Sequence, residues 1–120
     1  MSYEVLFVED GSQWHEIWEE QVEELEGDIV YLKATTIREA FDQFDAHPGL
    51  AAIVMDGCVP GNDINTESLV RAIRRSFQGP IIAASGRPDF IERLMRAGCD
   101  HKVQDKLQVI GLLGRILKLT

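Results

Sequence analysis

Carboxylate side chains follow apolar segments at several points of this sequence. The stretch AAIVMDGCVPG, residues 51–61, runs from strand-forming residues into Asp56 and then into turn-forming residues. Glu9 and Asp10 follow the apolar run YEVLFV, and Ser85 ends the run PIIAAS. A charged carboxylate at the end of a buried strand is costly unless a hydrogen-bonded turn, a basic partner or a metal ion offsets the cost. These positions are therefore the candidates for chemistry.

The segments that must position them alternate between two patterns. Short apolar or β-branched runs predict buried parallel strands. The expected strands are Tyr3–Asp10, Asp28–Ala34, Ala51–Asp56, Pro80–Ser85 and, more weakly, Asp100–Gln104. Helical patterns lie between and after them: one after Gly11, one opened by the Thr36 and Glu39 capping box, one over Thr66–Phe77, one from Pro88 and one over Leu107–Leu119. Five strands joined by right-handed crossover helices predict an α/β fold, a parallel sheet covered on both faces.

The carboxyl ends of neighbouring strands in such a sheet converge on one crevice. Glu9, Asp10, Asp56 and the hydroxyl of Ser85 are therefore expected to meet at one edge. Like charges placed this close are mutually unfavourable unless a cation joins them. Hard oxygen ligands favour Mg²⁺, so the sequence predicts a divalent cation at this edge.

Composition limits the classes of function. The 120 residues are 45% hydrophobic and 27% charged, which fits one compact domain over residues 1–120. The formal net charge of -8 repels a phosphate backbone, so we do not expect this domain to bind nucleic acid. No apolar run has the length of a membrane span and the N-terminus lacks a signal-peptide pattern, so we expect a soluble, cytoplasmic protein.

The cysteines and histidines give no recognisable metal or redox motif. Cys58 and Cys99 lie far apart and outside any C-x-x-C spacing, so we expect reduced thiols. His15, His47 and His101 are scattered along the chain. We expect them to occupy ordinary surface or boundary positions rather than to bind a metal.

Three motifs at successive strand ends carry a resemblance to a known family. They are the acidic pair ED after the first strand, MDGCVPG after the third and AASG after the fourth. With these motifs in this order, the chain resembles a receiver domain of the two-component response regulators, the family that includes the bacterial chemotaxis regulator. The resemblance covers nearly the whole chain. It implies a flavodoxin-like, doubly wound (βα)5 fold with strand order 2-1-3-4-5.

The resemblance also implies roles for the residues at the strand ends. Asp56 would be the phosphoryl acceptor and Ser85 would donate its hydroxyl to a phosphoryl oxygen, the switch contact of the family. Asp10 would bind Mg²⁺ directly and Glu9 would act mostly through a bound water. Asp56 and the backbone carbonyl of Cys58 would complete the protein ligands.

The chain departs from the family at the end of the fifth strand. The family lysine falls on Asp105 in the usual register, and Lys106 comes one residue later. We interpret Asp105 as a helix N-cap followed at the capping-box spacing by Gln108, and we expect Lys106 to be solvated. Lys106 could stand in for the family lysine only if the preceding loop were in effect one residue longer. The family's aromatic residue in this strand is also missing, because Lys102 or Val103 occupies its position.

The residues therefore support one function and two alternatives. We expect a receiver that takes a phosphoryl group from a phosphohistidine on a sensor histidine kinase or phosphotransfer protein, which docks near the first helix. It would not be an enzyme beyond its own phosphorylation and dephosphorylation. One alternative is a pseudo-receiver, a protein-interaction module that is not phosphorylated, which the substitution at Asp105 favours. The other is a small phosphatase-like enzyme with Asp56 as nucleophile, disfavoured because Cys58 occupies the position of its general acid.

The final helix suggests a contact surface. Its apolar residues form two neighbouring stripes, a wider arc than one sheet contact covers. They are Leu107, Ile110, Leu113 and Leu117 in the first stripe, and Val109, Leu112, Ile116 and Leu119 in the second. We expect part of this arc to be exposed and to form a partner or homodimer surface, with Arg93 and Arg96 of the fourth helix at its rim. Burial by the first and fourth helices and by the chain end is the alternative.

Overall fold

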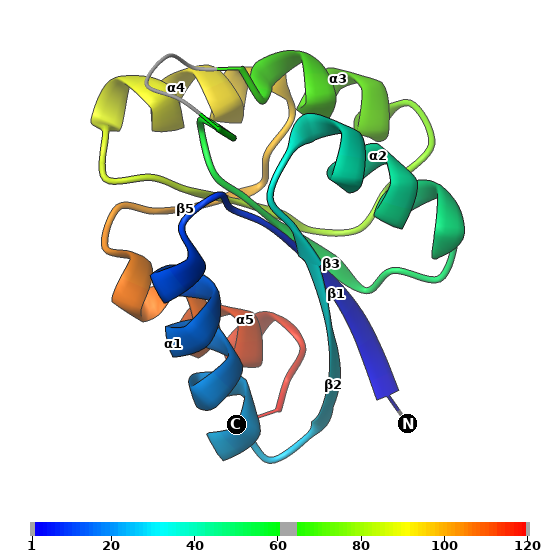
Figure 1. Ribbon diagram of the computed structural model, residues 1–120, viewed down its shortest axis with the longest axis vertical. Helices are drawn as coiled ribbons and strands as arrows, with labels where there is room; N and C mark the ends of the chain where they lie inside the picture. The colour runs from blue at the N-terminus through cyan, green and yellow to red at the C-terminus, as the bar shows by residue number, and fades with distance from the viewer. Residues whose placement is uncertain (1, 61–64, 120) are drawn as a thin grey trace.

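The computed structural model describes residues 2–60 and 65–119, which alternate regularly between strands and helices (Figure 1). The strands are β1 Ser2–Val8, β2 Asp28–Ala34, β3 Ala52–Met55, β4 Ile81–Ala84 and β5 His101–Val103. The helices are α1 Ser12–Glu24, α2 Ile37–Ala46, α3 Glu67–Arg74, α4 Pro88–Ala97, the short 3₁₀ helix η1 Lys106–Gln108 and α5 Val109–Ile116. Every expected strand and helix is present. The last expected helix begins as a 3₁₀ turn.

The strands form one parallel sheet in the order β2-β1-β3-β4-β5, which confirms the predicted topology. Figure 1 shows α1 and α5 on one face of this sheet and α2, α3 and α4 on the other. Both β3 and β4 are buried along their whole length. This explains why their sequences, AIVM and IIAA, are continuously apolar rather than alternating.

Two hydrophobic cores fill the spaces between the sheet and its helices. Alternate residues of β1 supply both, because successive side chains of a strand point to opposite faces. Leu6 and Val8 join the core beneath α2, α3 and α4. Val5 and Phe7 join the core beneath α1 and α5, which also contains Trp18. Trp18 is fully buried there.

The capping box predicted for α2 is present with one change of partner. Thr36 Oγ1 accepts a hydrogen bond from the backbone N–H of Glu39 at 3.1 Å. The Glu39 carboxylate reaches back to Thr35, where it accepts from the backbone N–H and from the hydroxyl, each at 2.7 Å. The helix therefore begins where the sequence indicates.

The last helix is more buried than its two apolar stripes suggested. Val109, Ile110 and Leu113 are buried. Leu112, Ile116 and Leu117 are partly buried and pack against the same core. Leu107, in η1, is 54% exposed. The expected exposure is wrong for Val109, which is fully buried. The sheet and α1 together cover a wider arc of this helix than the sheet alone would cover. No helix in the described part of the chain is long and apolar enough to cross a membrane.

Arg74 connects several segments at the amino end of the strands, opposite the carboxylates. Its Nε donates to the carbonyl of Gly98 at 3.0 Å, and its Nη1 donates to the carbonyls of Phe77 at 2.9 Å and Gly79 at 2.7 Å. Its Nη2 forms an ion pair with Asp100, whose carboxylate also accepts from the backbone N–H of Ile81 at 2.9 Å. The guanidinium thus holds the residues before β5 against those before β4.

Candidate functional site

Three carboxylates meet at the carboxyl edge of the sheet, as the strand ends predicted. Glu9 and Asp10 follow β1, and Asp56 follows β3 directly. Oxygen atoms of all three lie within 4.8 Å of one another. Glu9 and Asp56 are buried, whereas Asp10 is exposed. The cluster therefore opens to solvent on the side of Asp10.

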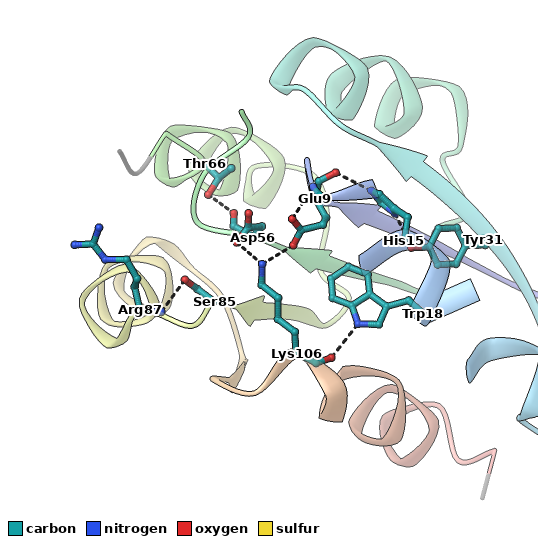
Figure 2. Close-up of polar contacts among 10 residues, drawn as sticks. Glu9, His15, Trp18, Tyr31, Asp56, Thr66, Ser85, Arg87 and Lys106 are labelled. Atoms are coloured by element: carbon teal, nitrogen blue, oxygen red, sulfur yellow. Dashed lines mark hydrogen bonds and ion pairs between the residues drawn. The ribbon is translucent and has the colours of Figure 1, made fainter. Parts of the chain in front are cut away.

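Lys106 lies in the middle of this cluster (Figure 2). Its Nζ is 2.6 Å from Glu9 Oε1 and 3.4 Å from Asp56 Oδ1, and its side chain is 15% exposed. The expectation that Lys106 would be solvated is wrong. Asp105 does cap η1, since its Oδ1 accepts from the backbone N–H of Leu107 at 3.0 Å. Capping by Asp105 and an inward Lys106 are compatible, because the 3₁₀ turn after β5 directs the two side chains differently.

Burial and charge together set the protonation of the cluster. Burial, and then the neighbouring Glu9 carboxylate, raise the pKa of Asp56 to about 6, while Lys106 and the N–H of Gly57 act in the opposite direction. Burial alone would lower the pKa of Lys106, but its contacts with Glu9 and Asp56 raise it overall. Lys106 is therefore a stable cation at neutral pH, whereas burial makes Asp56 harder to ionise than an exposed aspartate.

Glu9 is fixed through its backbone as well as its side chain. Its Oε2 accepts from the backbone N–H of Gly11 at 2.9 Å. Its carbonyl accepts from Nε2 of His15 at 2.7 Å, and the hydroxyl of Tyr31 lies 2.6 Å from Nδ1 of His15. Because a carbonyl can only accept, the proton of neutral His15 is assigned to Nε2, and Tyr31 donates to Nδ1. Figure 2 shows this chain of contacts leading from Tyr31 to Glu9.

His15 itself is not the surface or boundary residue that the sequence suggested. Its side chain is buried, with 1% exposed, and burial lowers its pKa. It is therefore a neutral hydrogen-bonding residue of the interior. Its partners come from β2 and from the end of β1, so nothing in the residues next to it along the chain could have shown this.

The segment after Asp56 is held by polar contacts from Asn65 and Thr66. Thr66 donates its hydroxyl to the carbonyl of Asp56 at 2.6 Å. Asn65 donates its backbone N–H to the carbonyl of Gly57 at 3.1 Å. A Cβ on Gly57 would lie 2.7 Å from Cδ2 of Phe90, so the packing of α4 requires glycine there. These contacts fix the backbone at Asp56 and Gly57.

Ser85 lies at the carboxyl end of β4, the strand that pairs with β3. It is buried, and its Oγ accepts from the backbone N–H of Arg87 at 3.1 Å. Its own N–H donates to the carbonyl of Val103 in β5 at 3.2 Å. The resemblance implies an aromatic residue in β5, at the position of either Lys102 or Val103. Of these two residues, Val103 is buried and Lys102 is exposed.

The oxygen donors fit a magnesium ion. All the side-chain ligands in the cluster are carboxylates, which Mg²⁺ prefers. Both carboxylate oxygens of Glu9 already accept hydrogen bonds, from Gly11 and from Lys106. Asp10 is exposed and Asp56 lies beside it. Asp10 and Asp56 are therefore the residues best placed to bind a cation directly, with Glu9 acting through water.

Comparison with solved structures identifies the architecture. A two-component response regulator from Clostridium difficile aligns over 97% of this chain and 96% of its own, with a TM-score of 0.78 and 16% identity. A putative response regulator from Chloroflexus aurantiacus aligns over 98% and 99%, with a TM-score of 0.78 and 19% identity. The chain has the receiver-domain fold. The Vibrio cholerae chemotaxis protein CheY4 is similar too, over 97% and 99%, with a TM-score of 0.76 and 16% identity.

The receiver fold is recognisable here from structure rather than from overall sequence. No protein-family model matches the chain, and a comparison with curated proteins finds no significant relative. The carboxylates of the cluster nevertheless lie at the strand ends where the motifs placed them. Sequence reasoning missed the side chains that support the cluster from neighbouring elements, namely His15, Thr66 and Trp18.

Trp18 gives the clearest example of a missed contact. Trp18 is fully buried and packs in the core beneath α1 and α5. Its Nε1 also donates to the carbonyl of Lys106 at 2.9 Å. A buried tryptophan usually needs a partner for its N–H. That need was the available signal, although it does not identify the partner.

Proposed function

We propose that this chain is a phosphoacceptor receiver domain of a two-component or phosphorelay system. Its donor would be a phosphohistidine on a sensor histidine kinase or a histidine phosphotransfer protein, and its acceptor would be Asp56. The observation that carries the proposal is the position of the buried Asp56 carboxylate, next to Glu9 and Asp10 and 3.4 Å from the Lys106 ammonium. The domain would act as a signalling module rather than as an enzyme with turnover of its own.

The proposed transfer is a substitution at phosphorus. A carboxylate oxygen of Asp56 attacks, an O–P bond forms, the P–N bond to the donor imidazole breaks, and the imidazole leaves with the electron pair. Such transfers depend mainly on positioning and on neutralising charge at the equatorial oxygens. Lys106 would supply positive charge. Because Ser85 Oγ accepts from Arg87, its hydroxyl proton is available to donate to a phosphoryl oxygen.

Mg²⁺ is part of the proposal. Asp10 and Asp56 would hold the ion directly, with the carbonyl of Cys58 as a third protein ligand and Glu9 acting through water. When bound, it would neutralise charge on the phosphoryl oxygens. Neither Cys58 nor Cys99 is in a disulfide bond and both are buried, which fits the reducing cytoplasm in which such systems operate.

The position of Lys106 changes the balance between this function and the alternatives. The substitution at Asp105 favoured a pseudo-receiver, but Lys106 now supplies an ammonium to the acidic cluster. The missing aromatic residue still favours a switch that differs from the one in the family, in which Ser85 is the switch contact. Lys102 and Val103 occupy the part of β5 where the aromatic residue is expected. A phosphatase-like activity remains disfavoured, because Cys58 lies where the general-acid carboxylate would be needed.

The decisive test is mass spectrometry of the intact protein after incubation with acetyl phosphate and Mg²⁺. We expect addition of one phosphoryl group, and we expect Asp56→Asn or chelation of Mg²⁺ to abolish it. Asp45→Asn, at an exposed acid of α2, is the matched control and should be modified like the wild type. If the wild type stays unmodified even with a competent kinase, the chain is a pseudo-receiver.

A further inference from the structure

The hydrogen bond from the Trp18 side chain to the backbone carbonyl of Lys106 joins residues that lie 88 positions apart in the chain. The indole Nε1–H of Trp18 donates to the Lys106 carbonyl, which also accepts from the backbone N–H of Val109. The indole is fully buried, and its ring packs in the core beneath α1 and α5. Figure 2 shows the indole against the backbone of Lys106, with the Lys106 side chain extending away from it to Glu9 and Asp56.

The direction of the Lys106 side chain depends on the orientation of its backbone. Lys106 is the first residue of η1, three residues after Val103, the last residue of the three-residue strand β5. Neither a short edge strand nor a single 3₁₀ turn fixes a backbone strongly. Two side-chain contacts add the missing restraint: Asp105 accepts from the N–H of Leu107, and Trp18 donates to the carbonyl of Lys106.

The helix that carries Trp18 also holds the ion-pair partner of Lys106. His15, one turn earlier in α1, donates to the carbonyl of Glu9 at 2.7 Å. Residues three apart on a helix lie on the same face. A single face of α1 therefore holds the backbones of both Glu9 and Lys106. The side chains of these two residues form an ion pair in which Lys106 Nζ lies 2.6 Å from Glu9 Oε1.

We infer that Trp18 is a positioning residue for Lys106. Its indole N–H holds the Lys106 backbone in the orientation that brings the ammonium onto Glu9 and Asp56. Packing alone would be satisfied by any ring of this size, so it is the N–H that carries the positioning. The consequence for phosphoryl transfer rests on the proposed function, whereas the positioning of the ammonium does not.

The test uses a replacement that keeps the ring and removes only the donor. Trp18 is replaced by the isosteric benzothienylalanine, in which sulfur takes the place of the indole N–H. The same replacement at Trp14 is the matched control, since the Trp14 ring lies 5.7 Å from the Lys106 ammonium and would keep that contact. Trp18→Phe is less suitable, because it leaves a void in the core.

The primary readout is the exchange of the Lys106 ammonium protons with water, followed by NMR without any phosphodonor. Loss of one neutral hydrogen bond should speed this exchange roughly two- to tenfold in the Trp18 replacement and leave it unchanged in the Trp14 replacement. Unchanged exchange in a folded Trp18 replacement, or equal effects at both positions, would overturn the inference.

The second readout is the rate of phosphorylation by acetyl phosphate, in the wild-type and Lys106→Met backgrounds. We expect the Trp18 replacement to slow the reaction only where Lys106 is present. Equal slowing in both backgrounds would show a merely structural role and overturn the inference. If no protein is phosphorylated but ammonium exchange still responds to Trp18, the positioning stands and the proposed function fails.

Discussion

Replacing Asp56 by asparagine should stabilise the fold at neutral pH when divalent cations are removed. The pKa of Asp56 is raised from its ordinary 3.8 to about 6, first by burial and then by Glu9. Well below pH 3.8 the carboxyl group is protonated in both the folded and unfolded states, so it costs nothing. Well above pH 6 it is ionised in both states, and the folded state carries the full cost of a buried charge.

The difference between the two pKa values corresponds to about 3 kcal/mol of unfolding free energy. This is the largest gain expected for Asp56→Asn, because the amide must also leave water. For a domain of this size, it corresponds to a rise in melting temperature of roughly 10 °C. The gain should be present at pH 8 and should shrink progressively as the pH falls through 6 toward 4.

The assay is urea unfolding of the wild type and Asp56→Asn at pH 4.5, 6 and 8 in excess EDTA. Asp10→Asn, at the exposed member of the same cluster, should have a smaller effect. Added Mg²⁺ should narrow the gap, because it binds the folded wild type more tightly than the variant. Equal stability of the two proteins at pH 8, or a gap that does not change with pH, would show that Lys106 already compensates the charge and would refute the reasoning.

Further substitutions test the charges and packing around the cluster and the burial of the last helix. Lys106→Met should lower the unfolding free energy by about 3 to 5 kcal/mol in urea titrations, because it leaves buried carboxylates without their cation, and a neutral outcome would mean that the ion pair contributes nothing. Gly57→Ala should cost about 1 to 3 kcal/mol through its clash with Phe90, and combining it with Phe90→Ala should cost less than the two separate losses added together. Val109→Glu should unfold the protein in circular dichroism, whereas Leu107→Glu, at an exposed position, should be tolerated and would weaken self-association in sedimentation if η1 forms part of a dimer surface.

The elements and the carboxylate cluster could be predicted because both follow from local patterns. Continuous apolar runs such as AIVM and IIAA are typical of strands covered on both faces, and alternating strands and helices leave few possible topologies. Once the sheet is parallel, residues that end its strands must share an edge. Asp56 and Glu9 were therefore placed correctly without knowledge of any tertiary contact.

The supporting contacts could not be predicted, because they depend on pairs of distant residues. The sequence around Lys106 favours a solvated first-turn lysine, and the contacts that direct it inward include the hydrogen bond from Trp18, 88 residues earlier. His15 is likewise explained by Tyr31 and by the carbonyl of Glu9. For the last helix, the width of the apolar arc was clear, but the extent to which α1 covers Val109 was not.

The guanidinium of Arg74 has a consequence for how the molecule opens. A three-residue edge strand such as β5 would be expected to fray readily, since it has neighbours on one side only and few backbone hydrogen bonds. Arg74 anchors the start of this strand through Gly98 and Asp100, while Lys106 follows its other end. Detachment of β5 would therefore withdraw the cation from the acidic cluster in the same event. The residue that limits such transient opening, and with it the exposure of Asp56 to solvent, lies at the far end of the sheet from the chemistry.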